Sequence, residues 1–123
     1  MAKSYRDLDI YRISFDLFVR AHRFSLQLPK YEMYELGSQL RRSSDSVNSN
    51  IVEGHGRRKY KKDFIKFLTY SHASNDETVN HLKKIKALYP QFKEQTSDLI
   101  NSYDILGGKI HNFTEYVLIN WRV

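Results

Sequence analysis

Three interruptions divide the sequence into four segments, each long enough for a helix of five or more turns. The interruptions are Pro29, the Gly54 and Gly56 pair, and Pro90. Proline removes a backbone donor, and glycine is the residue that most readily ends a helix. With about 100° of rotation per residue, the apolar side chains of each segment fall on stripes. The sequence therefore predicts an all-α chain, namely one antiparallel, up-and-down four-helix-bundle domain over residues 1–123. The expected helices cover approximately residues 8–28, 33–54, 60–88 and 93–120.

Three glycines lead to predictions of their own. Gly54 is expected to end the second helix, because glycine tolerates the left-handed backbone conformation found after helix ends. Gly107 and Gly108 lie inside the apolar pattern of the last segment. Since glycine is a poor helix former, we expect the last helix to be weakened or bent there.

The first segment has two apolar faces, separated by Arg12, Asp16, Arg20 and Arg23. One face consists of Tyr11, Phe15, Phe18, His22 and Leu26. The other consists of Ile10, Ile13, Leu17, Phe24 and Leu28. One face can pack inside the bundle, and the other then needs a cover, because a long exposed apolar row is unusual on a soluble monomer. We therefore expect a homo-oligomer and assign the second set to its interface. The alternative is a helix buried on both sides.

The chain is basic, with 20 Lys and Arg against 14 Asp and Glu and a net charge of +6. Such an excess favours acidic partners, of which nucleic acids are the commonest. Residues 41–66 alone hold eight basic and three acidic side chains, a net charge of +5. The candidate nucleic-acid-binding residues are Arg41, Arg57, Arg58, Lys59, Lys61, Lys62 and Lys66.

Two interpretations of this basic run remain open. In one, its cations bind phosphates with release of counterions, and Tyr60 stacks on an unpaired base. In the other, it is a solvated turn that aids solubility, and Tyr60 belongs to the core stripe. The sequence has no evident base-reading motif, so recognition would follow shape and charge.

A polar row follows the second segment and consists of Gln39, Arg42, Ser46, Asn50 and Glu53. Arg42 and Glu53 are about three helical turns apart, so they cannot pair within one helix. Each is therefore expected to find a partner on another helix or another subunit, with Ser74 and Glu77 as candidates. We favour a buried polar network that fixes helix register over a hydrolytic site.

Several kinds of chemistry lack their sequence signatures. There is no cysteine, and hence no disulfide, zinc–thiolate site or thiol nucleophile. The Gly-x-Ser-x-Gly elbow, the P-loop, the dinucleotide fingerprint and the Glu-x-x-His element of di-iron bundles are all missing. We therefore expect no enzymatic activity, no cofactor and no metal.

No apolar run approaches the roughly 20 residues of a membrane span, and the first residues lack a secretory signal, so we expect a cytoplasmic protein without a membrane partner.

The stretches "SQLRRSSDSVNSNIVEGHGRR" and "FIKFL" resemble the 23S rRNA intervening-sequence protein family, also called the four helix bundle protein family. The matching positions are Ser38, Gln39, Arg41, Arg42, Asn50, Ile51, Glu53, Gly54, Gly56, Arg57, Phe64, Phe67, Leu68, Ser74 and Glu77. Asn48 stands where many relatives have proline, so this helix is expected to be straighter. Asn75 and Val79 replace residues that are often leucine and glutamate, which leaves a shared polar site around Glu77 in question.

The resemblance implies a bundle that assembles as a ring, commonly a pentamer, in the bacterial cytoplasm. Members are encoded in intervening sequences of 23S rRNA genes, and most have no defined activity. A more distant resemblance is to the accessory protein of diversity-generating retroelements, a basic pentameric ring that binds nucleic acid and a reverse transcriptase. The resulting hypothesis is a non-enzymatic, ring-forming bundle that binds RNA or DNA. The alternative is a structural adaptor that presents a surface to a protein partner.

Overall fold

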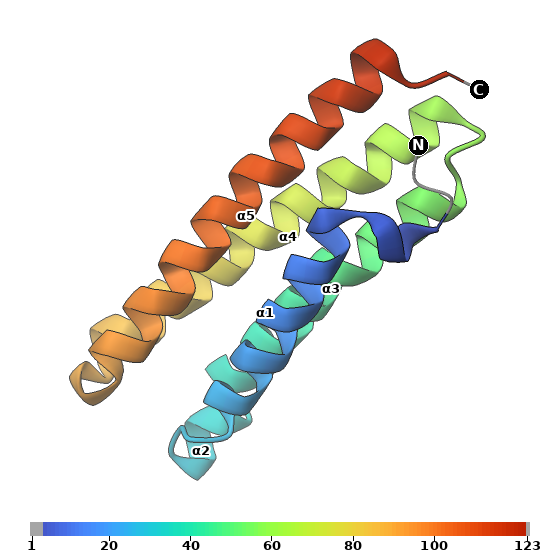
Figure 1. The fold of residues 1–123 in the computed structure, drawn as a ribbon. Helices are drawn as coiled ribbons and strands as arrows, with labels where there is room; N and C mark the ends of the chain where they lie inside the picture. The colour runs from blue at the N-terminus through green and yellow to red at the C-terminus, as the bar shows by residue number, and fades with distance from the viewer. Residues whose placement is uncertain (1–3, 123) are drawn as a thin grey trace.

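Four long helices that alternate in direction make up the bundle (Figure 1). The computed structural model describes residues 4–122. Its elements are η1 (Tyr5–Asp7), α1 (Asp9–Ser25), α2 (Lys30–Met33), α3 (Leu36–Gly56), α4 (Lys61–Leu88), η2 (Pro90–Phe92) and α5 (Lys93–Asn120). The all-α prediction is confirmed, and the single turn α2 is an element that the sequence pattern did not indicate. Within residues 4–122, no helix is both long and apolar enough to cross a membrane.

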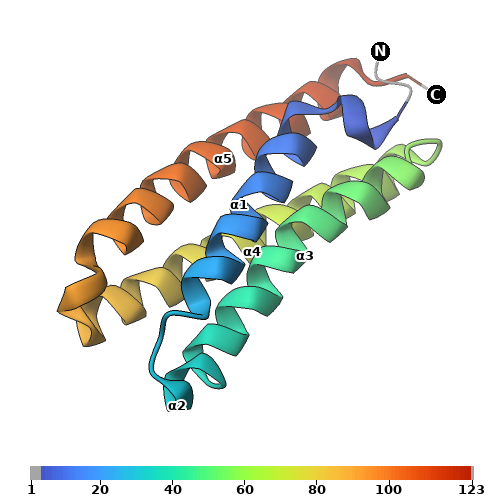
Figure 2. The same ribbon diagram turned by 60° about the horizontal axis from the view of Figure 1, so that its bottom comes forward.

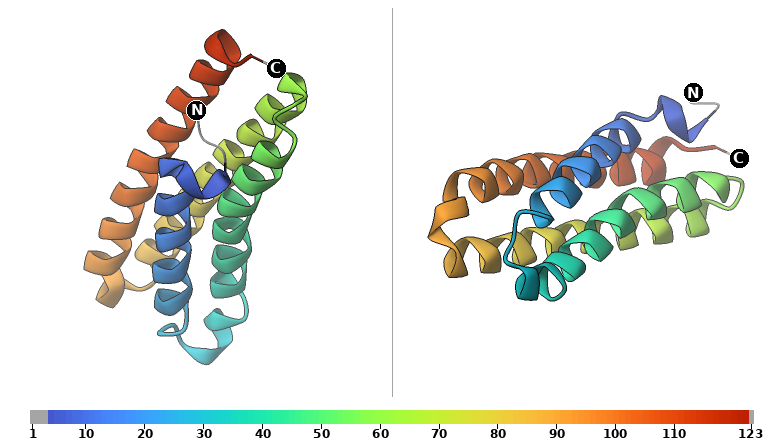
Figure 3. Two further views of the ribbon diagram at one scale, coloured as in Figure 1. Left: turned by 45° about the vertical axis from the view of Figure 1, so that its right-hand side comes forward. Right: turned by 90° about the horizontal axis from the view of Figure 1, so that it is seen from below.

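The four long helices do not pack equally well against one another. Helix α3 packs against α1 and α4, and α4 packs against α5 (Figures 2 and 3). Helix α1 has 17 residues and α5 has 28, so α1 covers only part of its neighbour. Three cavities of about 460, 340 and 250 Å³ follow the boundary between these two helices. The α1–α5 boundary is therefore the open side of the bundle.

Of the two apolar faces of α1, the one that was expected to form an oligomer interface is the one buried in the bundle. Ile10, Leu17, Phe24 and Leu28, assigned above to an oligomer interface, are only 2–4% exposed, because they pack in the core of the same chain. The fifth member, Ile13, is half-buried. By contrast, Phe15 is 51% exposed. The interface assignment is therefore wrong for the four buried residues.

Small residues explain why this face of α1 is the buried one. Ser14 and Ala21 alternate with the large apolar side chains and are almost fully buried, which lets α3 approach closely. Asn48 on α3 donates a hydrogen bond from Nδ2 to Ser14 Oγ at 3.1 Å. Asn48 thus links α3 to α1.

Gly54 and Gly107 lie where two helices pack closely together. Helix α3 continues through Gly54 to Gly56, and no glycine among residues 4–122 has a positive φ, so the predicted left-handed stop at Gly54 is wrong. A Cβ on Gly54 would lie 3.1 Å from Phe67 Cβ on α4. Helix α5 also continues through Gly107, where a Cβ would lie 2.9 Å from Asn75 Nδ2. Asn75 Nδ2 donates to the Tyr103 carbonyl at 2.8 Å, so glycine here admits a polar bridge between α4 and α5.

Candidate nucleic-acid interface

The α3–α4 corner, residues 57–66, is a tight turn followed by the first turns of α4. Backbone N–H groups of Arg57 and Arg58 donate back into the last turn of α3, at 3.0 Å to the Gly54 carbonyl and 3.1 Å to the His55 carbonyl. Tyr60 N–H then donates to the Arg57 carbonyl at 2.8 Å. Three consecutive hydrogen bonds of this kind close the chain into a tight turn, and the basic run lies on that turn and on the start of α4.

The far end of the chain supports this corner from beneath. Phe64 is fully buried, and its ring lies 5.0 Å from the Trp121 ring in an edge-to-face arrangement. Trp121 Nε1 donates a hydrogen bond to the Arg58 carbonyl at 3.3 Å. The sequence gives no sign of this contact, because Trp121 and Arg58 are 63 residues apart.

Arg57 is already bound to two carboxylates. Its Nε lies 2.8 Å from Glu53 Oε2, and its Nη1 lies 3.6 Å from Asp63 Oδ2. Its guanidinium also lies 4.9 Å from the centre of the Phe67 ring. The hydrogen bond with Glu53 is the main cause of a raised pKa of Arg57, so the side chain stays charged. Because its charge is balanced locally, Arg57 supports the corner more than it offers a free cation.

Two further arginines have structural contacts. Arg58 donates from Nη1 to the His55 carbonyl at 3.0 Å. Arg41 donates to Ser25 Oγ at 2.8 Å and to the Met33 carbonyl at 3.0 Å, which ties α3 to the ends of α1 and α2. Arg41 and Arg57 are sixteen positions apart along α3 and its C-cap, which corresponds to about 24 Å. The structure therefore does not bring Arg41 to the corner with the other predicted residues.

Four lysines and one tyrosine remain available at the corner. Lys59, Lys62 and Lys66 are exposed and Lys61 is half-buried, and no ion pair within the described part of the chain involves any of them. Lys62 and Lys66 are one helical turn apart, so they share a face. Tyr60 is 63% exposed, which contradicts its placement in a core stripe. Lys66 Nζ also lies 5.4 Å from the centre of the Phe67 ring, and the corner thus presents lysines without carboxylate partners close in sequence to an exposed aromatic ring.

The polar row on α3 is a surface feature with one bridge to α4. Ser46 Oγ and Ser74 Oγ are 2.8 Å apart, and Asn50 Nδ2 donates to Ser46 Oγ at 2.9 Å. Gln39, Arg42, Glu53 and Glu77 are exposed, so the expectation of a buried network is wrong for these four residues. Glu53 also pairs with Arg57 at the end of its own helix, where the sequence analysis expected a partner on another helix or subunit.

Other chemistry finds little support in the described residues. Residues 4–122 contain no group of three or more His, Asp or Glu side chains that could hold a metal ion. His81 is buried beside Glu77, with His81 Nε2 and Glu77 Oε2 3.9 Å apart. Burial is the main cause of the lowered pKa of His81, which favours the neutral ring.

Comparison with models of known protein families identifies the family of this chain. A family model described as the 23S rRNA-intervening sequence protein matches residues 6–112, from η1 through most of α5. The match includes the whole α3–α4 corner and ends before Trp121. No curated protein matches the chain.

Proposed function

The chain belongs to the 23S rRNA-intervening sequence protein family, and from that premise we propose that it is a non-enzymatic, self-associating bundle that binds RNA or DNA at the α3–α4 corner. One observation supports this proposal most strongly. Lys59, Lys62 and Lys66 are exposed without ion-pair partners, on an ordered turn that also exposes Tyr60. The family's description refers to 23S rRNA, which is consistent with a role that involves RNA.

The chemistry of the corner fits the backbone of a nucleic acid. Exposed ammonium groups bind phosphates mainly through the release of condensed counterions, so affinity should fall steeply with salt. An exposed tyrosine between such cations can stack on any unpaired base, because every base has a π-face. Recognition of this kind depends on charge and shape and is nearly independent of base sequence.

Self-association is the second part of the proposal, and α1 supplies the surface for it. Phe15 and Leu26 are more than half exposed, and Tyr11, Phe18 and His22 beside them are half-buried. We call these five residues the aromatic face of α1. A second subunit that covers it would repeat the basic corner around a symmetry axis, and weak phosphate contacts would then gain from multivalency. The family resemblance leads us to expect a ring of five subunits.

The first experiment measures binding of labelled structured RNA and duplex DNA by fluorescence anisotropy across a salt titration. Lys59→Glu with Lys62→Glu should weaken binding by more than about tenfold and flatten the salt dependence. The matched control is Lys30→Glu with Lys84→Glu, which makes the same change in net charge at exposed positions near the other end of the bundle. Equal losses in the two variants would show that net charge matters and that the corner does not. No binding by the unaltered protein even at low salt would favour the adaptor function.

The assembly is tested separately by sedimentation velocity and circular dichroism. Phe15→Glu should reduce the assembled mass while the helical signal stays the same, because the side chain is half exposed in the monomer. Leu17→Glu should instead unfold the chain, since it introduces a charge into the core. A folded Phe15→Glu variant that keeps the full assembled mass would exclude the aromatic face of α1 as the interface.

A further inference from the structure

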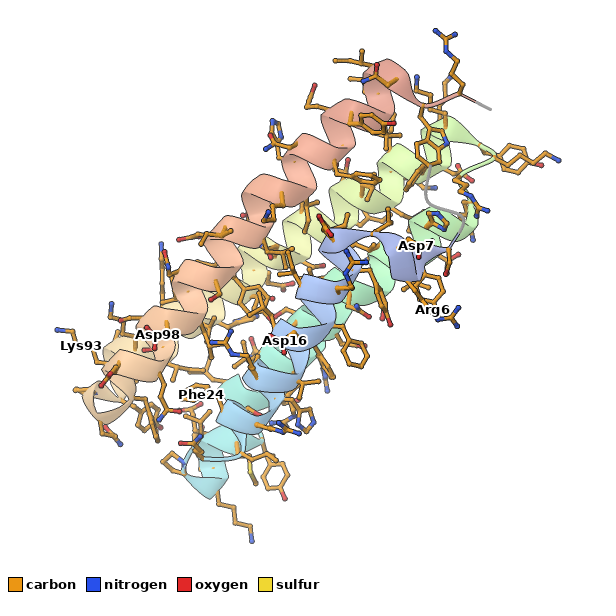
Figure 4. The ribbon with its side chains drawn as sticks, in the orientation of Figure 1. Arg6, Asp7, Asp16, Phe24, Lys93 and Asp98 are labelled. Carbon is orange, nitrogen blue, oxygen red and sulfur yellow. The ribbon has the colours of Figure 1, made fainter. Side chains whose placement is uncertain are left out.

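A second group of lysines surrounds a pocket at the opposite end of α4. The pocket has a volume of about 380 Å³ and is lined by Lys83, Lys86, Ala87, Pro90, Lys93 and Ile100. Two of its lysines come from the last turns of α4, one helical turn apart, and the third begins α5. Lys93 projects from this end of the bundle, away from the ribbon (Figure 4). We call this site the lysine pocket.

The lysines of the pocket have no carboxylate partner within ion-pair distance in the described part of the chain. Lys83 and Lys86 can interact favourably with the negative end of the α4 dipole. Lys93 cannot be explained in this way, because it is the first residue of α5, where the helix dipole is positive. Three like charges around one pocket repel one another, and a bound anion would relieve that repulsion.

The lysine pocket also has an aliphatic surface, called its floor below, which a ligand with an apolar part could cover. Ala87, Pro90 and the half-buried Ile100 provide an aliphatic surface between the lysines. A free inorganic anion would leave that surface in contact with water, whereas a ligand with an apolar or aromatic body would cover it. The volume is within the range of pockets that hold small organic ligands.

We propose that the lysine pocket binds an organic phosphate, in which a di- or triphosphate group contacts Lys83, Lys86 and Lys93 and an attached ring covers Ala87, Pro90 and Ile100. Lysine is depleted in protein–protein interfaces and common in phosphate sites, so the composition favours a phosphate ligand over a protein segment. This site is separate from the α3–α4 corner, and its test does not depend on nucleic-acid binding.

The test compares one organic phosphate with two smaller compounds, one that carries only its phosphate group and one that carries only its ring and sugar. Isothermal titration calorimetry at low ionic strength compares ADP, inorganic pyrophosphate and adenosine on the full chain. The proposal expects ADP to bind more tightly than either half, because only ADP satisfies the lysines and the floor together. Pyrophosphate that binds as tightly as ADP would reduce the site to a simple anion site and overturn the proposal. Undetectable binding of ADP would overturn it as well.

Variants locate the ligand within the molecule. Lys86→Gln and Lys93→Gln should each weaken ADP binding about tenfold, the loss expected for one charge-assisted hydrogen bond. Lys84→Gln is the matched control, because Lys84 lies on the same turns of α4 but does not line the pocket. Lys62→Gln controls for the corner. Ile100→Ser should weaken ADP binding and leave pyrophosphate unchanged, which a merely electrostatic site would not show. Equal losses in the pocket and control variants would refute the location.

Discussion

The two ends of α4 carry similar charges on differently built surfaces. At the α3–α4 corner, Arg57 is neutralised by two carboxylates and the remaining lysines spread over exposed surface around Tyr60. At the lysine pocket, three lysines surround a cavity with an aliphatic floor. An extended polyanion needs spaced charges that it can follow, whereas a compact anion needs charges that converge. The comparison shows that a count of basic residues does not identify a ligand without the shape of the surface that holds them.

The largest expected effect on stability comes from removing the Phe64 ring, which packs beneath the α3–α4 corner. Phe64→Ala should lower the free energy of unfolding by about 3–5 kcal/mol, because Phe64 is fully buried against Trp121 and Phe113. Phe92→Ala at the other end of α4 should lower it by only about 1–2 kcal/mol, since Phe92 is half-buried. Chemical denaturation measures both. Similar losses would mean that the two ends of α4 are supported equally.

The close approach of α3 and α4 at the corner gives a smaller effect. Gly54→Ala should destabilise the chain by about 1–3 kcal/mol, because the new Cβ would lie 3.1 Å from Phe67 Cβ and 3.3 Å from Phe64 Cδ1. Gly56→Ala is the matched control two residues away, where a Cβ has no neighbour within 4 Å. Thermal unfolding of the two variants should separate them. If Gly54→Ala is as stable as Gly56→Ala, the crossing has room that the structure does not show.

Substitution of Tyr60 should affect ligand binding at the α3–α4 corner and leave ligand binding at the lysine pocket unchanged. Tyr60→Ala should weaken the binding of single-stranded RNA by about 1–2 kcal/mol through the loss of stacking, and should leave duplex binding nearly unchanged. It should have no effect on ADP at the lysine pocket, which is at the other end of α4. Anisotropy and calorimetry give the two affinities. Unchanged affinity for single strands would leave the lysines as the whole of the nucleic-acid site.

Helix periodicity predicted the architecture well because it is a local property. The expected helix over about 60–88 matches α4, Lys61–Leu88, and the last expected helix matches α5 in both bounds. The choice between the two apolar faces of α1 failed, since both have the same period and only packing against α3 distinguishes them. Small Ser14 and Ala21 on the buried face were the available signal.

The candidate site was predicted in part for the same reason. The pairing of Arg57 with Glu53 follows the i,i+4 rule, but it was missed, because a partner for Glu53 was expected on another helix or subunit. The contact of Trp121 with Phe64 and Arg58 joins distant parts of the chain and depends on the fold. Arg41 was grouped with the corner by sequence proximity, although a helix of this length places it near α2. Closeness in the sequence therefore showed where basic residues are concentrated, but it did not show which of them share a surface.

The smallest expected effect concerns acid stability near the lysine pocket. His81 lies on α4 close to this end, between Glu77 and Lys84 in the sequence. Burial is the main cause of its lowered pKa. The charge of Glu77 opposes this shift, and the charge of Lys84 adds to it. A histidine with a lowered pKa in the folded state binds fewer protons than in the unfolded chain, where its pKa is near 6.5. Stability from this group is therefore complete above about pH 6.5 and declines as the pH falls below that value. His81→Gln should remove this part of the pH dependence of the melting temperature, whereas His72→Gln, on a more exposed part of α4, should leave it in place. An unchanged pH profile in His81→Gln would show that the buried ring does not limit acid stability at this end of the bundle.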